Sequence, residues 1–592
     1  NSRAQAARTS SQQARAVVYR EGHTRRGVGK PDVLINRILV KPASGTTINT
    51  LAAAYGFSVI RRALPNHFIF EVEPNDDSLL ASLELANALY ESGNTEFAQP
   101  VFRKAVALRR VLNDTLFPDL WHILNTRTDS PFVAGNDAKV SLAWDYASGL
   151  GVNVMIVDTG VAVAHPDLSP NARTDIDFDI LDNDGDPTPI NSDHGTQVAG
   201  VAAARGDNNL GVAGVAYRAG LVGVRLVDFA PTDAEIVQAM SYRVNVAAVA
   251  DQTHINSNSW GPDDNDPGLK EALTPAMEAA LLDGVTNGRN GKGVIYVWAA
   301  GNGRGVNQNI NYDGFASSRF TIAVGASGGD GKYSSYSEPG ASMVLSAPSS
   351  FLSESIVSTS GSIGYTSSFG GTSAAAPLVS GVVALMLQVN PNLTWREVQK
   401  ILIITAQKID LTDPGWIFTG SNSFNHSYGF GRVHAKNAVL IAASFTSMDP
   451  PLPPLTASET GLSIPIPDDD LNGITRNFVV SSPAPFRAEQ VELTVNITHP
   501  YRGDLVITLK APNGATSILS GVHNDSGNDY SNWKFTSVLH FGTNPVGTWT
   551  LRIADGNAID VGTLQSWSAT IYGGPPHVVG TPSLRVPFFE NP

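Results

Sequence analysis

The chain has 592 residues, which is too long for a single hydrophobic core and indicates roughly two to four domains. Hydrophobic residues make up 42% and charged residues 16%, and with 55 Gly and 36 Pro this is typical of a turn-rich globular protein rather than a disordered or fibrous one. The net charge of −14, without a long Lys/Arg run, argues against nucleic acid or an anionic membrane as partner, and zero cysteines exclude disulfides, zinc thiolates and a Cys nucleophile.

The amino-terminal part is polar. Residues 1–33 carry scattered Arg and Gln, so we expect a flexible lead-in there. Residues 1–20 lack the apolar core of a signal peptide, and no stretch of about 18 apolar residues predicts a membrane span. The chain starts without Met, which fits the removal of an address segment.

Residues 34–106 predict a small α+β domain. The apolar periodicity and the turn residues give, in order, a strand over 35–42, a helix over 46–56, strands within 58–74, a helix over 76–93 and a strand over 95–106. This β-α-β-β-α-β order is that of a split β-α-β unit.

Residues 107–447 predict an α/β domain. Short, wholly apolar strands alternate with helices expected over 233–248 and 269–288, which indicates a parallel sheet with helices on both faces. The expected strands lie in "GVNVMIVDTG", "GLVGVRLVD", "THINSNSWG", "GVIYVWAAGN" and "FTIAVGASG". Such sheets bind ligands at the carboxyl ends of their strands, so the side chains that follow the strands are the candidate site.

The last part of the chain changes character. Four prolines in "PPLPP" predict a linker over 448–460. Alternating strands with Gly, Asn and Asp turns then predict an all-β sandwich over 461–575, and residues 576–592 form a tail.

Three reactive side chains lie next to predicted strand ends: Asp158 in "IVDTG", His194 in "SDHGTQVAG" and Ser373 in "GGTSAAAPLVSG". Each alone has a structural explanation, because Asp-Thr-Gly is a common turn, His-Gly-Thr an ordinary helix start and Ser before an Ala-rich helix usually an N-cap. Together they have the chain order of the subtilisin triad. In such a triad Ser373 attacks, His194 takes its proton and Asp158 holds the imidazole.

These segments resemble the subtilisin-like serine proteases. "NSNSWGPDD", "WAAGNGRG", "GGTSAAAPLVSGVVALML" and "PNLTWREVQKIL" resemble the kexin and furin branch of that family, and the resemblance extends over residues 113–572. It implies that Asn302 and the backbone N–H of Ser373 stabilise the oxyanion. It also implies that residues 34–106 are a prosegment, acting as folding template and inhibitor, that residues 461–575 are a P domain, and that the protein is secreted or periplasmic.

Carboxylates gather in "NSNSWGPDDNDP", residues 256–267. A solvated surface loop is one explanation. The resemblance implies another, in which Asp264 and Asp313 are the acids of the primary specificity pocket. Its further residues are Asp263, Trp260 and Gly261. A fixed carboxylate pair favours a planar cation with several donors, so Arg should be preferred over Lys before the cleaved bond.

Two departures from the family concern the neighbouring subsites. Thr159 stands where the family has an acid after the catalytic Asp, and Ile236 stands at another acidic position, with Glu235 one residue away. Strict recognition of paired basic residues is therefore not expected.

Oxygen-rich clusters predict calcium sites. Asp179, Asp184 and Asp186 share one short turn, where acids repel one another without a cation, although the spacing is not that of an EF-hand. By resemblance, a second site comprises Asp114, Asp167, the side chain of Asn208 and carbonyls near Leu210 and Val212. A third pairs Asp264 with Glu338, where Gln308 replaces a family acid.

The segment "VFRKAVALRRVL", residues 101–112, carries two basic pairs between the prosegment and the α/β domain. We expect autoprocessing after Arg110, with Arg103 or Lys104 as the alternative site and a solvated basic linker as the structural explanation. The sequence thus predicts a calcium-dependent serine endopeptidase that cleaves protein or peptide substrates after Arg. A broad-specificity subtilisin and a catalytically silent adhesion or binding protein remain as alternatives.

Overall fold

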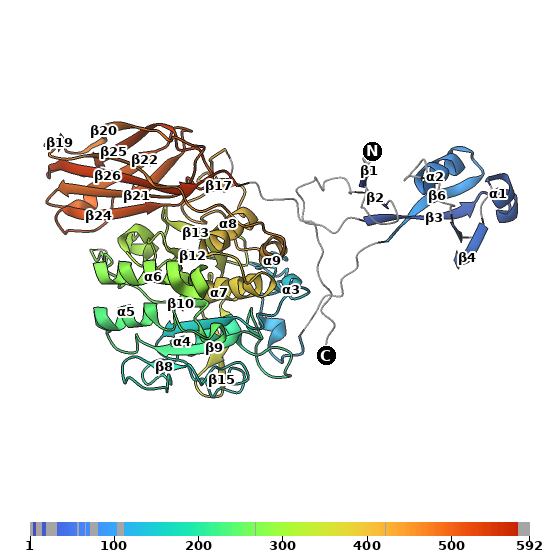
Figure 1. Ribbon diagram of the computed structural model, residues 1–592, viewed down its shortest axis with the longest axis horizontal. Coiled ribbons are helices and arrows are strands. Elements are labelled where there is room, and N and C mark those ends of the chain that lie inside the picture. Colours follow the sequence, from blue (N-terminus) through green and yellow to red (C-terminus); the bar gives the residue numbers. More distant parts are fainter. Residues whose placement is uncertain are drawn as a thin grey trace. The chain divides into compact units, whose positions relative to one another are not determined.

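The computed structural model describes residues 4–7, 15–18, 32–55, 58–64, 67–71, 81–103, 112–266, 268–420 and 422–577. The chain divides into two compact units, Asn1–Leu108 and Arg109–Pro592 (Figure 1). The second unit contains both the predicted α/β domain and the predicted all-β domain, so these two are packed together.

The first unit is an antiparallel sheet with two helices. Its elements are β1 (Ala4–Ala7), β2 (Arg15–Val18), β3 (Asp32–Pro42), α1 (Ile48–Tyr55), β4 (Ser58–Leu64), β5 (His67–Glu71), α2 (Ala81–Glu91) and β6 (Thr95–Arg103). Along the chain, β3, α1, β4, β5, α2 and β6 confirm the predicted β-α-β-β-α-β order. In the sheet the strands lie in the order β1-β2-β3-β5-β4, and β6 also pairs with β3. The lead-in expected over 1–33 differs, because β1 pairs with β2 and β2 continues the sheet along the first residues of β3.

The second unit is built on a seven-stranded parallel sheet. Its strands are β7 (Asn153–Asp158), β8 (Phe178–Asp179), β9 (Gly220–Arg225), β10 (Ile255–Asn258), β11 (Ile295–Ala299), β12 (Thr321–Ser327) and β13 (Met343–Pro348), in the order β13-β12-β11-β10-β7-β9-β8. The five predicted strands are confirmed as β7, β9, β10, β11 and β12.

Helices cover both faces of this sheet (Figure 1). They are α3 (Val140–Ala143), α4 (His194–Ala203), α5 (Asp233–Ser241), α6 (Pro275–Gly291), α7 (Thr372–Val389), α8 (Trp395–Thr405) and α9 (Ala435–Ala443). Along β7, Val154 and Ile156 pack in one core with α4 and α7, whereas Met155 and Val157 pack in the other core with α5 and α6. Successive side chains of a strand point to opposite faces of the sheet, so a strand that is buried on both faces has to be apolar at consecutive positions.

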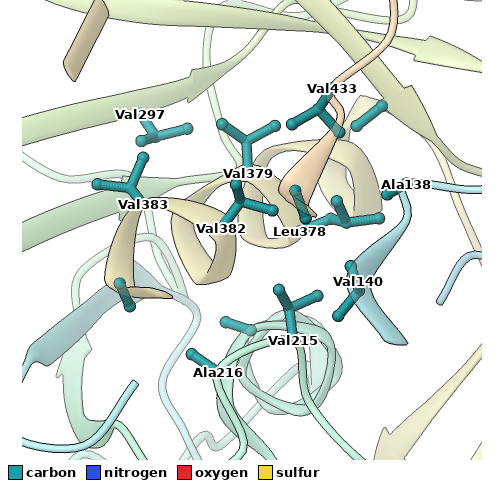
Figure 2. Close-up of a cluster of buried hydrophobic side chains, with 14 of the residues drawn as sticks. Ala138, Val140, Val215, Ala216, Val297, Leu378, Val379, Val382, Val383 and Val433 are labelled. Atoms are coloured by element: carbon teal, nitrogen blue, oxygen red, sulfur yellow. The ribbon is translucent and has the colours of Figure 1, made fainter. Parts of the chain in front are cut away.

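Helix α7 lies in the middle of the larger core. Figure 2 shows its side chains Val379, Val382 and Val383 between Val297 of the sheet and the segment that carries Val215. Among the described helices it is the one that is long and apolar enough to cross a membrane, and 83% of it is buried inside the fold. A helix that is apolar on every side is accounted for here by its place in the core.

Helix α6 begins later than the sequence suggests. It was expected from residue 269, but Thr274 caps it and Pro275 is its first residue. In residues 269–273, Leu269 instead lines the pocket described below, and Glu271 forms a β-bridge with Asp313. Between β13 and α7, the strands β14 (Ile356–Ser360) and β15 (Gly364–Phe369) form an antiparallel hairpin.

The all-β domain is a sandwich of two antiparallel sheets. One contains β18 (Leu455–Glu459), β19 (Ile464–Ile466), β21 (Arg487–Thr498), β24 (Tyr530–Ser537) and β26 (Gly562–Gly574), and the other β20 (Asp470–Val480), β22 (Leu505–Lys510), β23 (Thr516–Ser520) and β25 (Gly547–Asp555). Because β18 pairs with β26, this domain begins inside the linker expected over 448–460. Tyr312 and Ala341, which precede the linker, pack in its core.

Candidate active site

The three predicted triad residues come from the end of one strand and the starts of two helices. Asp158 ends β7 and is fully buried, and His194 is the first residue of α4. Oδ1 of Asp158 lies 2.7 Å from Nδ1 of His194 and also accepts a hydrogen bond from the Thr159 N–H. The carboxylate thus fixes the imidazole so that Nε2 is the nitrogen left for chemistry.

The electrostatic setting of His194 favours a proton on it. Burial lowers the pKa of the imidazole, but the charge and hydrogen bond of Asp158 and the charge of Asp193 outweigh burial, so the pKa lies above its ordinary value. A base of this kind takes a proton readily from a nearby hydroxyl.

Ser373 is the second residue of α7. The helix begins at Thr372, and its N-cap Gly371 has a positive φ of 71°. At the second position the backbone N–H of Ser373 has no acceptor within the helix and is free to act on an oxyanion. Its hydroxyl donates to the Ser259 carbonyl at 3.4 Å rather than to His194. Catalytic hydrogen bonds are often incomplete before substrate binds.

Asn302 follows β11 and reaches both the nucleophile segment and the pocket. Its Oδ1 accepts from the Thr372 N–H at 2.8 Å, and its Nδ2 donates to Asp264 at 2.8 Å. The second hydrogen of the same amide group is left for another acceptor. The structure therefore places Asn302 beside Ser373, in the cavity both residues line.

A cavity of about 300 Å³ opens next to Ser373. The predicted specificity residues that line it are Trp260, Gly261, Asp263, Asp264 and Asp313, together with Glu338 and Gln308. The fold thus brings the expected acids from two distant segments to one hollow beside the nucleophile.

Asp313 is held in place by backbone N–H groups. Its Oδ1 accepts from the N–H groups of Phe315 and Ala316, at 2.7 and 3.3 Å. Burial, followed by repulsion from Glu271 and Asp264, raises the pKa of Asp313 to about 7. A Cβ on Gly261 would lie 3.0 Å from Oδ2, so glycine gives this carboxylate its space.

The all-β domain supports the same pocket. Tyr312, next to Asp313, stacks on His523 and hydrogen-bonds Ser520 at 2.8 Å. Lys270, whose side chain is 2% exposed, forms an ion pair with Asp525, which Arg502 contacts at 2.6 Å. Sequence reasoning missed this support, because residues 270 and 525 are far apart in the chain and nothing local predicts their pairing.

The side chains of the second predicted calcium site, those of Asp114, Asp167 and Asn208, lie together. Asp114 and Asp167 are buried, and Nδ2 of Asn208 donates to Asp167 at 2.7 Å. The Val212 N–H donates to Asp167, and the Leu210 N–H donates to Asn208. Burial raises the pKa of both carboxyls, and they repel each other or a nearby acid, while no Lys or Arg pairs with either one in the described part of the chain. This donor set fits a hard cation bound by oxygen.

The three-aspartate turn has a different partner. Asp179 pairs at 2.5 Å with the buried Arg225, which also contacts Asp182 and Asp228. Asp184 and Asp186 accept hydrogen bonds from backbone N–H groups in the turn. Arg225 on β9 therefore supplies positive charge to Asp179, but among the described residues it forms no ion pair with Asp184 or Asp186, so a calcium site in this turn stays a prediction.

The third predicted site is only partly formed. Glu338 is 5% exposed and accepts from the Gly303 N–H, and burial, followed by repulsion from Asp264, raises its pKa well above its ordinary value. Nε2 of Gln308 donates to the Asp266 carbonyl. Across the described ranges, no three His, Asp or Glu side chains come together closely enough to hold a metal by themselves. Any cation must therefore also use amide or backbone oxygens.

The sequence also singled out the processing site and Thr159. Arg110 and Lys104 lie outside the described residues, so the processing site stays a prediction. Thr159, where the family has an acid, donates to the Ser192 carbonyl and accepts from the Gly195 N–H. It therefore holds the start of the His194 helix.

Two parts of the chain match known families. Residues 149–431 match the subtilase family, and residues 488–571 match the proprotein convertase P-domain. The crystal structure of a serine protease of Aeromonas sobria resembles the fold with a TM-score of 0.69 and 25% identity, over 79% of this chain and 97% of that one.

Curated relatives agree. Protease KEX1 of Kluyveromyces lactis is 34% identical over 478 residues, which are 78% of this chain and 61% of that protein. Proprotein convertase subtilisin/kexin type 7 of Homo sapiens is 35% identical over 543 residues, 86% of this chain and 67% of that protein. The chain thus spans roughly two thirds of these proteins' length. With the Asp158, His194 and Ser373 geometry, these matches show that the chain belongs to the subtilase family of serine endopeptidases, in its kexin/furin-like branch with a P domain.

Proposed function

We propose that this serine endopeptidase cleaves protein or peptide substrates after basic residues, chiefly Arg, and that calcium stabilises its active form. The observation that carries the proposal is the carboxylate pair, Asp264 and Asp313, in a cavity of about 300 Å³ beside Ser373. A guanidinium in that cavity would meet two fixed acids in a partly dry setting, which favours Arg over Lys.

The chemistry follows from the geometry. His194, held by Asp158, takes the proton of Ser373 as its hydroxyl attacks the carbonyl carbon of the substrate. The oxyanion that forms accepts hydrogen bonds from the Ser373 N–H and the Asn302 amide. His194 then returns the proton to the leaving amine, and water repeats the sequence on the acyl-enzyme.

Calcium is assigned to Asp114, Asp167 and Asn208, because the two carboxylates and the Asn208 amide lie together without a basic side chain among the described residues. An ion bound there would supply positive charge to the two carboxylates. It would also link residue 114, near the start of the second unit, to residues 167 and 208. The remaining predicted ligands are carbonyls at Leu210 and Val212, with Asp264 and Glu338 as a further candidate pair.

Maturation and location are proposed on the family resemblance. Residues 34–106 act as an inhibitory prosegment, which the enzyme removes by cleavage after Arg110, in an oxidising, calcium-rich compartment such as the periplasm or the exterior. The split β-α-β fold of the first unit supports the prosegment assignment.

Two measurements test the proposal. A serine-directed fluorophosphonate should label the protein, and Ser373→Ala should abolish labelling; an unlabelled wild type would favour the silent binding protein. A panel of peptides that differ only in Arg, Lys or Leu before the cleaved bond should show Arg preferred by more than tenfold, and equal rates would favour a broad-specificity subtilisin.

A further inference from the structure

Asp193 precedes the proposed catalytic histidine and behaves unusually for its position. It is the N-cap residue of α4, where an Asp side chain commonly accepts a hydrogen bond from the first turn of the helix. Here it makes no such cap bond. Its Oδ2 instead accepts from the Ser360 hydroxyl at 2.5 Å and the Gly361 N–H at 3.0 Å, at the tip of the β14–β15 hairpin.

The rest of the hairpin follows the same helix. The hydroxyls of Ser358 and Thr359 donate to the carbonyls of Gln197 and Thr196 in α4, at 2.6 and 2.7 Å. Both side chains are fully buried. Three consecutive residues of β14, counting Ser360, therefore bind α4 through their hydroxyl groups.

The other end of the hairpin reaches the nucleophile. Phe369, the last residue of β15, packs edge-on against the His194 ring with 5.7 Å between the centroids. Only three residues separate Phe369 from Ser373. The hairpin thus contacts the His194 helix at one end and leads directly into the Ser373 segment at the other.

We propose that Asp193 is a positioning residue for the triad, which anchors the β14–β15 hairpin to the His194 helix and stabilises the imidazolium form by its negative charge. This inference rests on the proposed triad. The charged groups that act on His194 are Asp158 from β7 and Asp193 itself, while the hairpin presents the apolar Phe369 ring. Burial alone would raise the pKa of Asp193, but hydrogen bonds from Ser360, Gly361 and Gln197 outweigh it and keep the carboxyl ionised.

The test measures the rate of fluorophosphonate inactivation of the purified, autoprocessed enzyme against pH, because this reagent carries no cation and does not depend on Asp313. In Asp193→Asn, which keeps one oxygen for the hairpin but loses the charge, the acid limb should move to lower pH, since neutral His194 then persists further into acid. The plateau rate should fall about three- to tenfold, because the imidazolium formed in the reaction is less stabilised.

Two variants separate charge from structure. Ser360→Ala removes one bond to the hairpin and leaves the charge, so its acid limb should stay in place. Asp193→Glu keeps the charge and should retain the wild-type acid limb. An unmoved acid limb in Asp193→Asn, or an equal shift in Ser360→Ala, would overturn the inference. If Ser373→Ala is inactive, the proposed function still stands, whichever result the Asp193 and Ser360 variants give.

Discussion

Replacing Asp313 by Asn tests the specificity pocket directly. The Oδ1 of Asp313 is used by the N–H groups of Phe315 and Ala316, so Oδ2, beside Gly261, is the oxygen available to a substrate guanidinium. A hydrogen bond to a charged partner contributes about 1.5–3 kcal/mol. Since about 1.4 kcal/mol is a factor of ten, the ratio of kcat/KM for Arg over Leu peptides should fall about 10- to 150-fold.

The pH profile adds a second readout. The pKa of Asp313 is about 7, so below that pH the free enzyme carries a neutral carboxyl that no longer attracts Arg. Arg peptides should therefore show a second loss of rate near neutrality, in addition to the His194 acid limb common to all substrates, and Asp313→Asn should remove this second limb alone. Asp263→Asn is the matched control, because Asp263 is an exposed acid lining the same cavity, and it should change the ratio less than about threefold. The reasoning is refuted if Asp313→Asn keeps the wild-type ratio or if Asp263→Asn loses as much.

Three further outcomes are expected. Gly261→Ala should lower the Arg over Leu ratio about tenfold with an unchanged melting temperature, since the added Cβ presses on Asp313 Oδ2 at 3.0 Å; a wild-type ratio would contradict this. Lys270→Met should cost about 3 kcal/mol in urea unfolding, because it leaves the buried Asp525 short of a partner, and a loss below about 1 kcal/mol would count against that role. Prolonged chelation with EGTA should lower the melting temperature, and the free energy of unfolding should fall by about 2.7 kcal/mol if calcium was present at a hundred times its Kd; Asp114→Asn should make this effect smaller, and an unchanged effect would contradict the site.

Local patterns predicted much of this molecule. Apolar strands such as β7 are recognisable because both of their faces are buried, and the topology of parallel sheets explains why Asp158 stands at a strand end. The partners of charged groups were harder to predict from the sequence. Arg225 lies 46 residues from Asp179, so the local sequence of the turn did not predict that a guanidinium pairs with this acid.

The same limit applies to boundaries. The start of α6 was misplaced because residues 269–273 have a helical apolar pattern, yet Glu271 pairs with Asp313 and Lys270 with Asp525. These long-range pairs override local preference, and the capping Thr274 then sets where the helix begins. The sandwich begins early for a similar reason, since β18 finds its partner β26 at the far end of the domain.

The position of Ser373 also determines when during folding the enzyme gains its cleaving activity. The nucleophile begins α7, and that helix is buried almost completely along its length. Its N-terminus, with Ser373, is therefore positioned only after the surrounding core has formed. The chain consequently gains its cleaving activity only once its own core is folded.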